Sequence, residues 1–212
     1  MNTLQHHVIS IGLILAAFAI GSSSLVVVTE KATRQKIIDN ERQTLLKAIN
    51  ILVPKKYYNN DILADTIEIP PEQQLATSKP STVYRARLDG NPIAAVFTSI
   101  APDGYSGKIK LLIGVYNNGD LAGVRVIQHK ETPGLGDKIE PRKSDWINKF
   151  SGLSLNEPIS TQWQVKKDGG YFDQFTGATI TPRAVIRAIK NALLYFKAHQ
   201  DTLFHQQFEK AP

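Results

Sequence analysis

The sequence predicts an α+β domain, in which antiparallel strands pack with helices, behind one N-terminal transmembrane helix. Strand patterns joined by turn residues fill residues 83–128, and an amphipathic helical pattern follows at residues 182–199. An uncharged apolar run predicts the membrane helix. We therefore expect five parts: an N-terminal tail, a transmembrane anchor, a helical stalk with an irregular connector, the folded domain and a C-terminal tail. Their expected bounds are 1–7, 8–28, 29–80, 81–199 and 200–212.

The anchor is the run at residues 8–28, which is mostly Ile, Leu, Val and Ala. A helix rises 1.5 Å per residue, so about 21 residues span roughly 30 Å, the thickness of a bilayer's hydrocarbon core. Ala17-Phe18-Ala19 resembles the cleavage site of a signal peptide, which is the alternative. The preceding tail has no Lys or Arg, however, and signal peptides begin with a positively charged region. We therefore expect an uncleaved, single-pass anchor.

The stalk and connector follow the anchor. Residues 31–53 carry apolar side chains at helical spacing and end at Pro54, which predicts a helix. Residues 55–80 contain Pro70-Pro71 and Pro80 together with an Asn-Asn-Asp run, which indicates irregular structure.

The domain begins with two expected hairpins. Residues 83–88 and 93–99 flank Asp89-Gly90, and residues 108–116 and 121–128 flank an Asn-Asn-Gly-Asp turn. A short strand is expected at 162–167, ending at Asp-Gly-Gly. The last helix is expected from Pro182 to about His199. Its expected buried residues are Val185, Ile189, Leu193 and Phe196, with Ala188 and Ala192 beside them.

The composition excludes several functions. The chain has no cysteine, which excludes disulfides, iron–sulfur ligation by this chain, thioether haem attachment and a cysteinyl flavin. Its five histidines show no metal-site spacing. The net charge of +6 is spread over isolated pairs such as Lys55-Lys56, without a basic cluster or interleaved aromatic residues, so we expect no nucleic-acid partner.

Small and hydroxyl-bearing residues crowd together just ahead of the last helix. Residues 173–182 read Asp-Gln-Phe-Thr-Gly-Ala-Thr-Ile-Thr-Pro. Thr181 suits the N-cap and Pro182 the first helical position. A helix start offers unpaired N–H groups and a partial positive charge, so it suits a phosphate. Gly177 and Ala178 would let that phosphate approach the backbone. The alternative is an ordinary capped helix after a turn.

This run resembles the flavinylation motif Asp-x-x-(Ser/Thr)-Gly-Ala-(Ser/Thr)-x-(Ser/Thr). The resemblance implies that Thr179 carries FMN through a phosphoester bond, with Thr176 and Thr181 as the other two hydroxyl positions. It also implies a role for Asp173, either in positioning the segment for a flavin transferase or in bonding to the flavin ring. The alternative for Asp173 is a plain turn residue.

A second motif, His-Lys-Glu-Thr-Pro-Gly-Leu-Gly-Asp, occupies residues 129–137. Its proline and glycines impose an unusual backbone path with exposed N–H groups. A flavin ring needs an apolar surface on its face and hydrogen-bond partners at its edge. Leu135 could supply the first, and Glu131, Thr132 and the amide of Gly136 the second. The alternative is a tight hairpin loop.

A lysine near the flavin could also stabilise the anionic reduced ring by Coulomb attraction. Lys166 and Lys167 are the candidates, and on the expected strand they point to opposite faces, so only one of them would do so. The alternative is two solvated lysines.

The segment Ala-Pro-Asp-Gly-Tyr-Ser-Gly at 101–107, a hairpin, the second motif and the flavinylation motif occur in the order seen in FMN-binding domains. Over the anchor and most of residues 83–200, the chain resembles the RnfG (RsxG) family of the Rnf electron-transport complex. The resemblance implies an electron carrier with one covalent FMN. The complex would couple electron transfer between ferredoxin and NAD to ion translocation.

The same resemblance implies a bacterial inner-membrane location, a cytoplasmic N-terminal tail and an FMN-binding domain on the periplasmic side. Its partners would be membrane and iron–sulfur subunits, with a flavin transferase during maturation. No general base, nucleophile or metal site emerges from the sequence, so we expect no independent turnover. One alternative is the component of the sodium-translocating NADH:quinone reductase that has the same domain and the same flavin bond. The other is a flavin-free, membrane-tethered binding module.

The charges flanking the anchor oppose this topology. Five Lys and Arg residues follow the anchor within twenty residues, and none precedes it. The positive-inside rule therefore favours a cytoplasmic domain. We follow the resemblance, because large domains are translocated largely regardless of charge.

Overall fold

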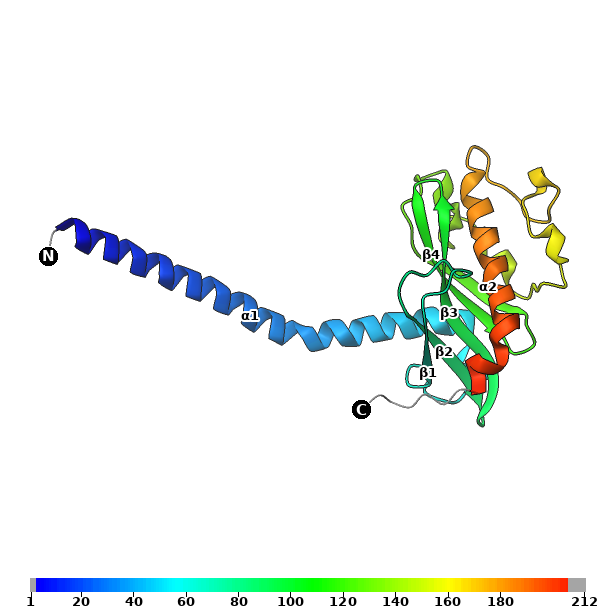
Figure 1. The fold of residues 1–212 in the computed structure, drawn as a ribbon, viewed down its shortest axis with the longest axis horizontal. Helices are drawn as coiled ribbons and strands as arrows, with labels where there is room; N and C mark the ends of the chain where they lie inside the picture. Colours follow the sequence, from blue (N-terminus) through cyan, green and yellow to red (C-terminus); the bar gives the residue numbers. More distant parts are fainter. Residues whose placement is uncertain (1–2, 206–212) are drawn as a thin grey trace. The chain divides into compact units, whose positions relative to one another are not determined.

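The computed structural model describes residues 3–205; residues 1–2 and 206–212, the ends of the two expected tails, lie outside the described residues. The chain divides into two compact units, residues 1–46 and 47–212. Figure 1 shows one long helix in the first unit and a sheet with a second long helix in the other.

The first unit contains most of helix α1, which runs without interruption from Thr3 to Leu52 and so joins the expected anchor and stalk. Large apolar side chains such as Leu13 and Phe18 are exposed along it. A helix that is apolar all round needs an apolar surrounding, since water would penalise this surface. Within the described part of the chain, α1 is the one helix long and apolar enough to cross a membrane.

The last turn and a half of α1 belongs to the second unit, where Ile49 and Leu52 are buried. Leu52 packs over two glycines of the sheet. A Cβ atom at Gly114 or Gly123 would lie 3.3 or 3.1 Å from Leu52, so a larger residue at either position would require Leu52 to move by a few tenths of an ångström.

The sheet has five antiparallel strands in sequential order: β1 (Thr66–Ile69), β2 (Ser81–Leu88), β3 (Asn91–Gly104), β4 (Gly107–Tyr116) and β5 (Leu121–Gln128). Both expected hairpins are confirmed. At the first, Asp89 and Gly90 both have positive φ, of 50° and 82°, as a two-residue type I′ turn requires. The connector expected to be irregular contains β1, which pairs with β2.

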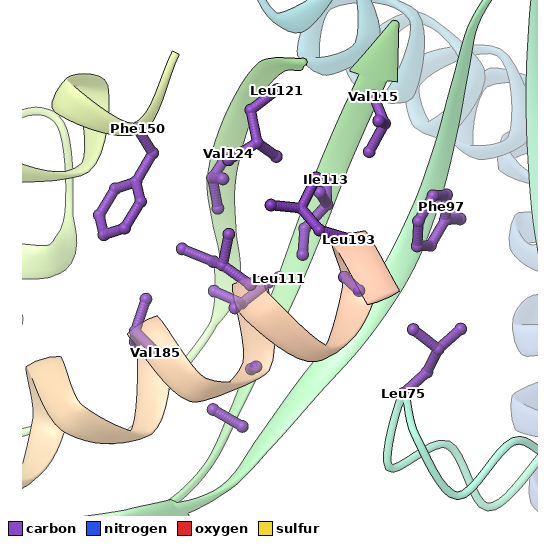
Figure 2. Packing of buried hydrophobic residues seen from close by; sticks show 14 of the residues in the cluster. Leu75, Phe97, Leu111, Ile113, Val115, Leu121, Val124, Phe150, Val185 and Leu193 are labelled. Carbon is purple, nitrogen blue, oxygen red and sulfur yellow. The ribbon is translucent and has the colours of Figure 1, made fainter. Parts of the chain in front are cut away.

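Helix α2 (Ile180–His205) packs across one face of the sheet. Its expected buried residues are confirmed, and Figure 2 shows Val185 and Leu193 facing Leu111, Ile113 and Val124 of β4 and β5. The helix starts two residues earlier than expected and continues past His199. Pro182 is therefore the third helical residue, still in the first turn, where its missing N–H costs no helical hydrogen bond.

Residues 129–179 form short turns of 3₁₀-helix: η2 (Gly136–Ile139), η3 (Trp146–Phe150), η4 (Ser160–Gln162) and η5 (Lys166–Asp168). Aromatic side chains hold this segment, with the rings of Phe150 and Phe172 stacked 4.6 Å apart. The prediction of a strand at 162–167 is wrong. Only a single bridge joins Val165 to Phe172, because Trp163 and Val165 are buried in this aromatic cluster instead of pairing with a neighbouring strand.

Candidate functional site

Two cavities of the second unit contain most of the expected site residues. The smaller, the threonine cavity, has a volume of about 230 Å³. It is lined by Tyr105, Glu131, Thr132, Leu135, Gly136, Gly177, Ala178, Thr179, Ile180 and Thr181. The larger, the lysine cavity, has a volume of about 560 Å³. It is lined by Trp146, Lys149, Gln162, Lys166, Gly170, Tyr171, Phe172 and Asp173.

Thr179 lies immediately before α2, and its carbonyl accepts the N–H of Arg183 at 3.4 Å. Gly177 has a φ of 78°, which turns the chain into the helix start. Within residues 3–205, the partly exposed Thr179 hydroxyl makes no hydrogen bond, and neither do the backbone N–H groups of Ile180 and Thr181. A free hydroxyl therefore stands beside free backbone donors.

Thr181 is not the N-cap, contrary to the sequence-based expectation. Its side chain is fully buried inside the first turn, and its hydroxyl donates a hydrogen bond to Oε2 of Glu131. The N-cap pattern was misleading because a hydroxyl near a helix start can bond a tertiary partner instead of a backbone N–H.

Glu131 is 4% exposed, and its carboxylate joins three segments of the cavity wall. Oε1 accepts the backbone N–H of Ser106 at 2.9 Å, while Oε2 accepts the Thr181 hydroxyl. A Cβ at Gly104 or Gly136 would lie 2.9 or 2.8 Å from this carboxylate, so both positions need glycine. A buried carboxylate is tolerated here because hydrogen bonds satisfy it.

His129 links the backbone of Glu131 to Glu140 at the end of η2. Its Nδ1 accepts the backbone N–H of Glu131 at 3.0 Å, so in the neutral ring Nε2 carries the proton and donates to Oε1 of Glu140, also at 3.0 Å. The hydrogen bond from His129, helped by Arg142, holds the pKa of Glu140 below its usual value.

Leu135 sits at the tip of the loop, with its backbone N–H and that of Gly136 both donating to the Thr132 carbonyl at 3.1 Å. Its side chain is 42% exposed. The Leu135 Cδ2 atom lies 3.5 Å from the position of a Cβ at Gly177, so the second motif touches the flavinylation motif. The loop is a tight turn, and it lines a cavity with the helix start.

The remaining expected residues lie elsewhere. Asp173 lines the lysine cavity, where Lys166 and Lys149 reach its carboxylate at 2.6 and 3.4 Å and lower its pKa. Lys167 and Thr176 line neither cavity and are exposed. The expectation that Lys166 and Lys167 point to opposite faces of a strand is wrong, since both lie in η5.

Sequence reasoning missed Tyr105 and Ile180, which also line the threonine cavity. The available signal for Tyr105 was its place between Gly104 and Gly107, in the segment that precedes β4. Among the described residues, no group of three or more His, Asp or Glu side chains could hold a metal ion.

Comparison with known families agrees with this geometry. The family model of the FMN-binding domain matches residues 104–194, which include every residue that lines either cavity. The class of the folded domain is therefore an FMN-binding domain of α+β architecture. A second model, the RnfG N-terminal region, matches residues 1–52, a range that includes the whole of α1.

Three similar proteins are each named as the G component of an ion-translocating oxidoreductase complex. That of Vibrio cholerae serotype O1 is 48% identical over 92% of this chain and 93% of its own length. That of Pseudoalteromonas atlantica is 47% identical over 91% of this chain and 90% of its own length. That of Shewanella oneidensis is 44% identical over 96% of both chains. This chain belongs to the RnfG family of ion-translocating oxidoreductase complexes.

Proposed function

We propose that this chain is the flavin-carrying, electron-relaying component of a membrane-bound Rnf-type complex, with FMN attached to Thr179 through a phosphoester. The complex couples electron transfer between ferredoxin and NAD to ion translocation. The observation that carries the proposal is the Thr179 hydroxyl, which is free of hydrogen bonds within residues 3–205, partly exposed and on the wall of the threonine cavity.

The residues around Thr179 fit a phosphate. The N–H of the exposed Ile180 makes no hydrogen bond within residues 3–205 and can donate one, and the start of α2 adds a partial positive charge. Gly177 has no side chain to block the approach. In the phosphoester, the Thr179 oxygen takes the place of one phosphate oxygen, so the chain gains one FMN less one water.

A flavin transferase would make this bond from a dinucleotide that holds FMN in a phosphoanhydride. The Thr179 oxygen then bonds to phosphorus, the anhydride bond breaks, a nucleoside monophosphate leaves and the hydroxyl proton passes to solvent. The exposed position of Thr176, Gly177 and Ile180 leaves the segment open to such an enzyme.

The same cavity fits part of the ring system. About 230 Å³ is below the roughly 300–1,000 Å³ of sites that enclose a whole small ligand. The cavity therefore takes part of an FMN and leaves the rest accessible, as electron exchange with a partner requires. Leu135 offers an apolar surface, while the carboxylate of Glu131 is occupied by protein donors and holds the wall in place.

When bound, FMN supplies the redox chemistry of the protein. This chain's own residues bind, orient and partly shield it. Helix α1, the one apolar helix of sufficient length among the described residues, supports a single-pass membrane location. The bacterial inner membrane and the periplasmic side of it are the proposed location of the FMN-binding domain, as the family resemblance implies. Membrane and iron–sulfur subunits of the complex are the partners that we propose.

In-gel fluorescence of the denatured protein tests the attachment, because only covalent flavin survives denaturation. The full chain is expressed in a host with the flavin transferase, and we expect fluorescence from the wild type and none from Thr179→Ala. Thr161→Ala is the matched control, since Thr161 is an exposed threonine outside both the flavinylation motif and the threonine cavity; it should keep its fluorescence. A non-fluorescent wild-type band would favour a flavin-free binding module.

A further inference from the structure

We infer that Tyr105 is a further flavin-contacting residue, whose ring lies against the isoalloxazine ring in the threonine cavity. This inference rests on the proposed function. It assigns the ring to this cavity and not to the larger lysine cavity, and it names the side chain that meets the ring there besides Leu135.

Tyr105 occupies the turn between β3 and β4, where Gly104 pairs with Gly107. It lines the threonine cavity together with Leu135 and the helix start, although these three come from separate parts of the chain. An aromatic side chain and an aliphatic one thus meet in a single cavity. Flat aromatic ligands bind to such surfaces through stacking and apolar contact.

The tyrosine has no partner of its own among the described residues. Its side chain is 68% exposed, and it makes no ring contact, hydrogen bond or cation–π contact with residues 3–205. Leu135 and Ile180, at 42% and 47% exposed, share the cavity wall. Large apolar side chains left open around one cavity are a feature of binding sites.

The turn that carries Tyr105 is nevertheless fixed. The N–H of the next residue, Ser106, donates to Glu131 at 2.9 Å, and Glu131 also accepts the Thr181 hydroxyl. The backbone beneath Tyr105 is therefore tied to the first turn of α2, immediately after Thr179. The attachment point and the tyrosine are both connected to the buried Glu131 carboxylate, so their spacing is constrained before the flavin binds.

The lysine cavity is the competing location for the ring. It is larger and also contains an exposed tyrosine, Tyr171. Its two lysines, however, are engaged with Asp173, and it includes neither Thr179 nor a residue of the 131–136 loop. The covalent tether and the apolar loop residue are both in the threonine cavity.

Fluorescence lifetime separates the two locations. An excited flavin takes an electron from a tyrosine in contact with it, and the electron then returns, so emission is quenched without net chemistry. Phenylalanine has nearly the same shape as tyrosine but does not donate this electron. In the flavinylated full chain in detergent, Tyr105→Phe should lengthen the lifetime of the covalent flavin several-fold, while Tyr105→Trp should keep it short.

Tyr171→Phe is the matched control, because Tyr171 is similarly exposed but lines the lysine cavity. It should leave the lifetime unchanged. A flavinylated Tyr105→Phe protein with the wild-type lifetime would overturn the inference, and so would a lengthened lifetime in Tyr171→Phe. Absence of covalent flavin from the wild type would instead refute the proposed function, so the two failures are distinguishable.

Discussion

Thr181, in the first turn of α2, donates its hydroxyl hydrogen to the buried carboxylate of Glu131, fifty residues earlier in the chain. This bond joins the two sequence motifs. Through the second oxygen of Glu131 it also reaches the β3–β4 turn at Ser106. The walls of the threonine cavity are therefore held by one carboxylate, which explains why a buried acid is found in a site that needs no general base.

Thr181→Val tests the hydrogen bond between Thr181 and Glu131. Valine has nearly the same shape as threonine but lacks the hydroxyl, so it leaves a buried carboxylate oxygen without its donor. We expect the free energy of unfolding to fall by about 1–3 kcal/mol, measured by urea titration of the full chain in detergent. Thr181→Ser keeps the hydroxyl and is the control. Equal stability of the valine variant and the wild type would show that the bond contributes nothing.

Leu135→Ala tests the apolar wall. Leu135 is 42% exposed, so covering its free surface with the ring contributes about 1 kcal/mol, less than the roughly 1.5–3 kcal/mol of complete burial. We expect normal covalent loading, because Thr179 is unchanged, but an altered absorbance spectrum and slower electron relay in the complex. An unchanged spectrum with full activity would mean that the loop is only a turn.

Glu140 should make folding sensitive to acid. Its hydrogen bond from His129 lowers the folded-state pKa below the ordinary value of 4.5. A carboxyl whose pKa is lower in the folded state than in the unfolded state stabilises the fold at pH values above its unfolded-state pKa. This stabilisation is lost as the pH falls through the folded-state pKa. For this partly exposed group we expect at most about 1 kcal/mol.

The measurement is the unfolding free energy of the wild type and Glu140→Gln, followed downward from pH 4.5. The variant should lose less stability over this range than the wild type does. Glu68→Gln is the control, since Glu68 is exposed on β1 and makes no ion pair within residues 3–205. Parallel curves for the wild type and Glu140→Gln would contradict the role assigned to the His129 hydrogen bond.

The location of the FMN-binding domain can be measured directly, because the chain has no cysteine. Asn118 lies exposed in the turn between β4 and β5, so Asn118→Cys introduces a single accessible thiol. A membrane-impermeant thiol reagent should label it in cells whose inner membrane is intact. Labelling only after lysis would place the domain in the cytoplasm, as the basic residues after the anchor favour.

The sequence predicted those elements whose signals are local. The turn at Asp89-Gly90 and the alternation on either side of it lie within twenty residues, so the hairpin could be recognised from its own residues. The buried residues of α2 were predicted for the same reason, since Val185, Ile189 and Leu193 repeat at helical spacing. β1 was missed because four residues before Pro70 give too short a pattern.

The errors in the site come from contacts that are distant in sequence. Thr181 looked like an N-cap because its partner, Glu131, lies outside any local window. The residues at 162–167 alternate like a strand, but Trp163 and Val165 pack into the aromatic cluster. Tyr105 was not singled out, because only the fold brings its turn to the start of α2.

The most direct test of the central claim is the mass of the peptide that contains Thr179, taken from the full chain produced with its flavin transferase. Fragmentation should place an added mass of one FMN less water on Thr179, and none on Thr176 or Thr181. Thr179→Ala should give the unmodified mass while the protein still folds. An unmodified Thr179 in the wild type, or the flavin mass on another residue, would contradict the account.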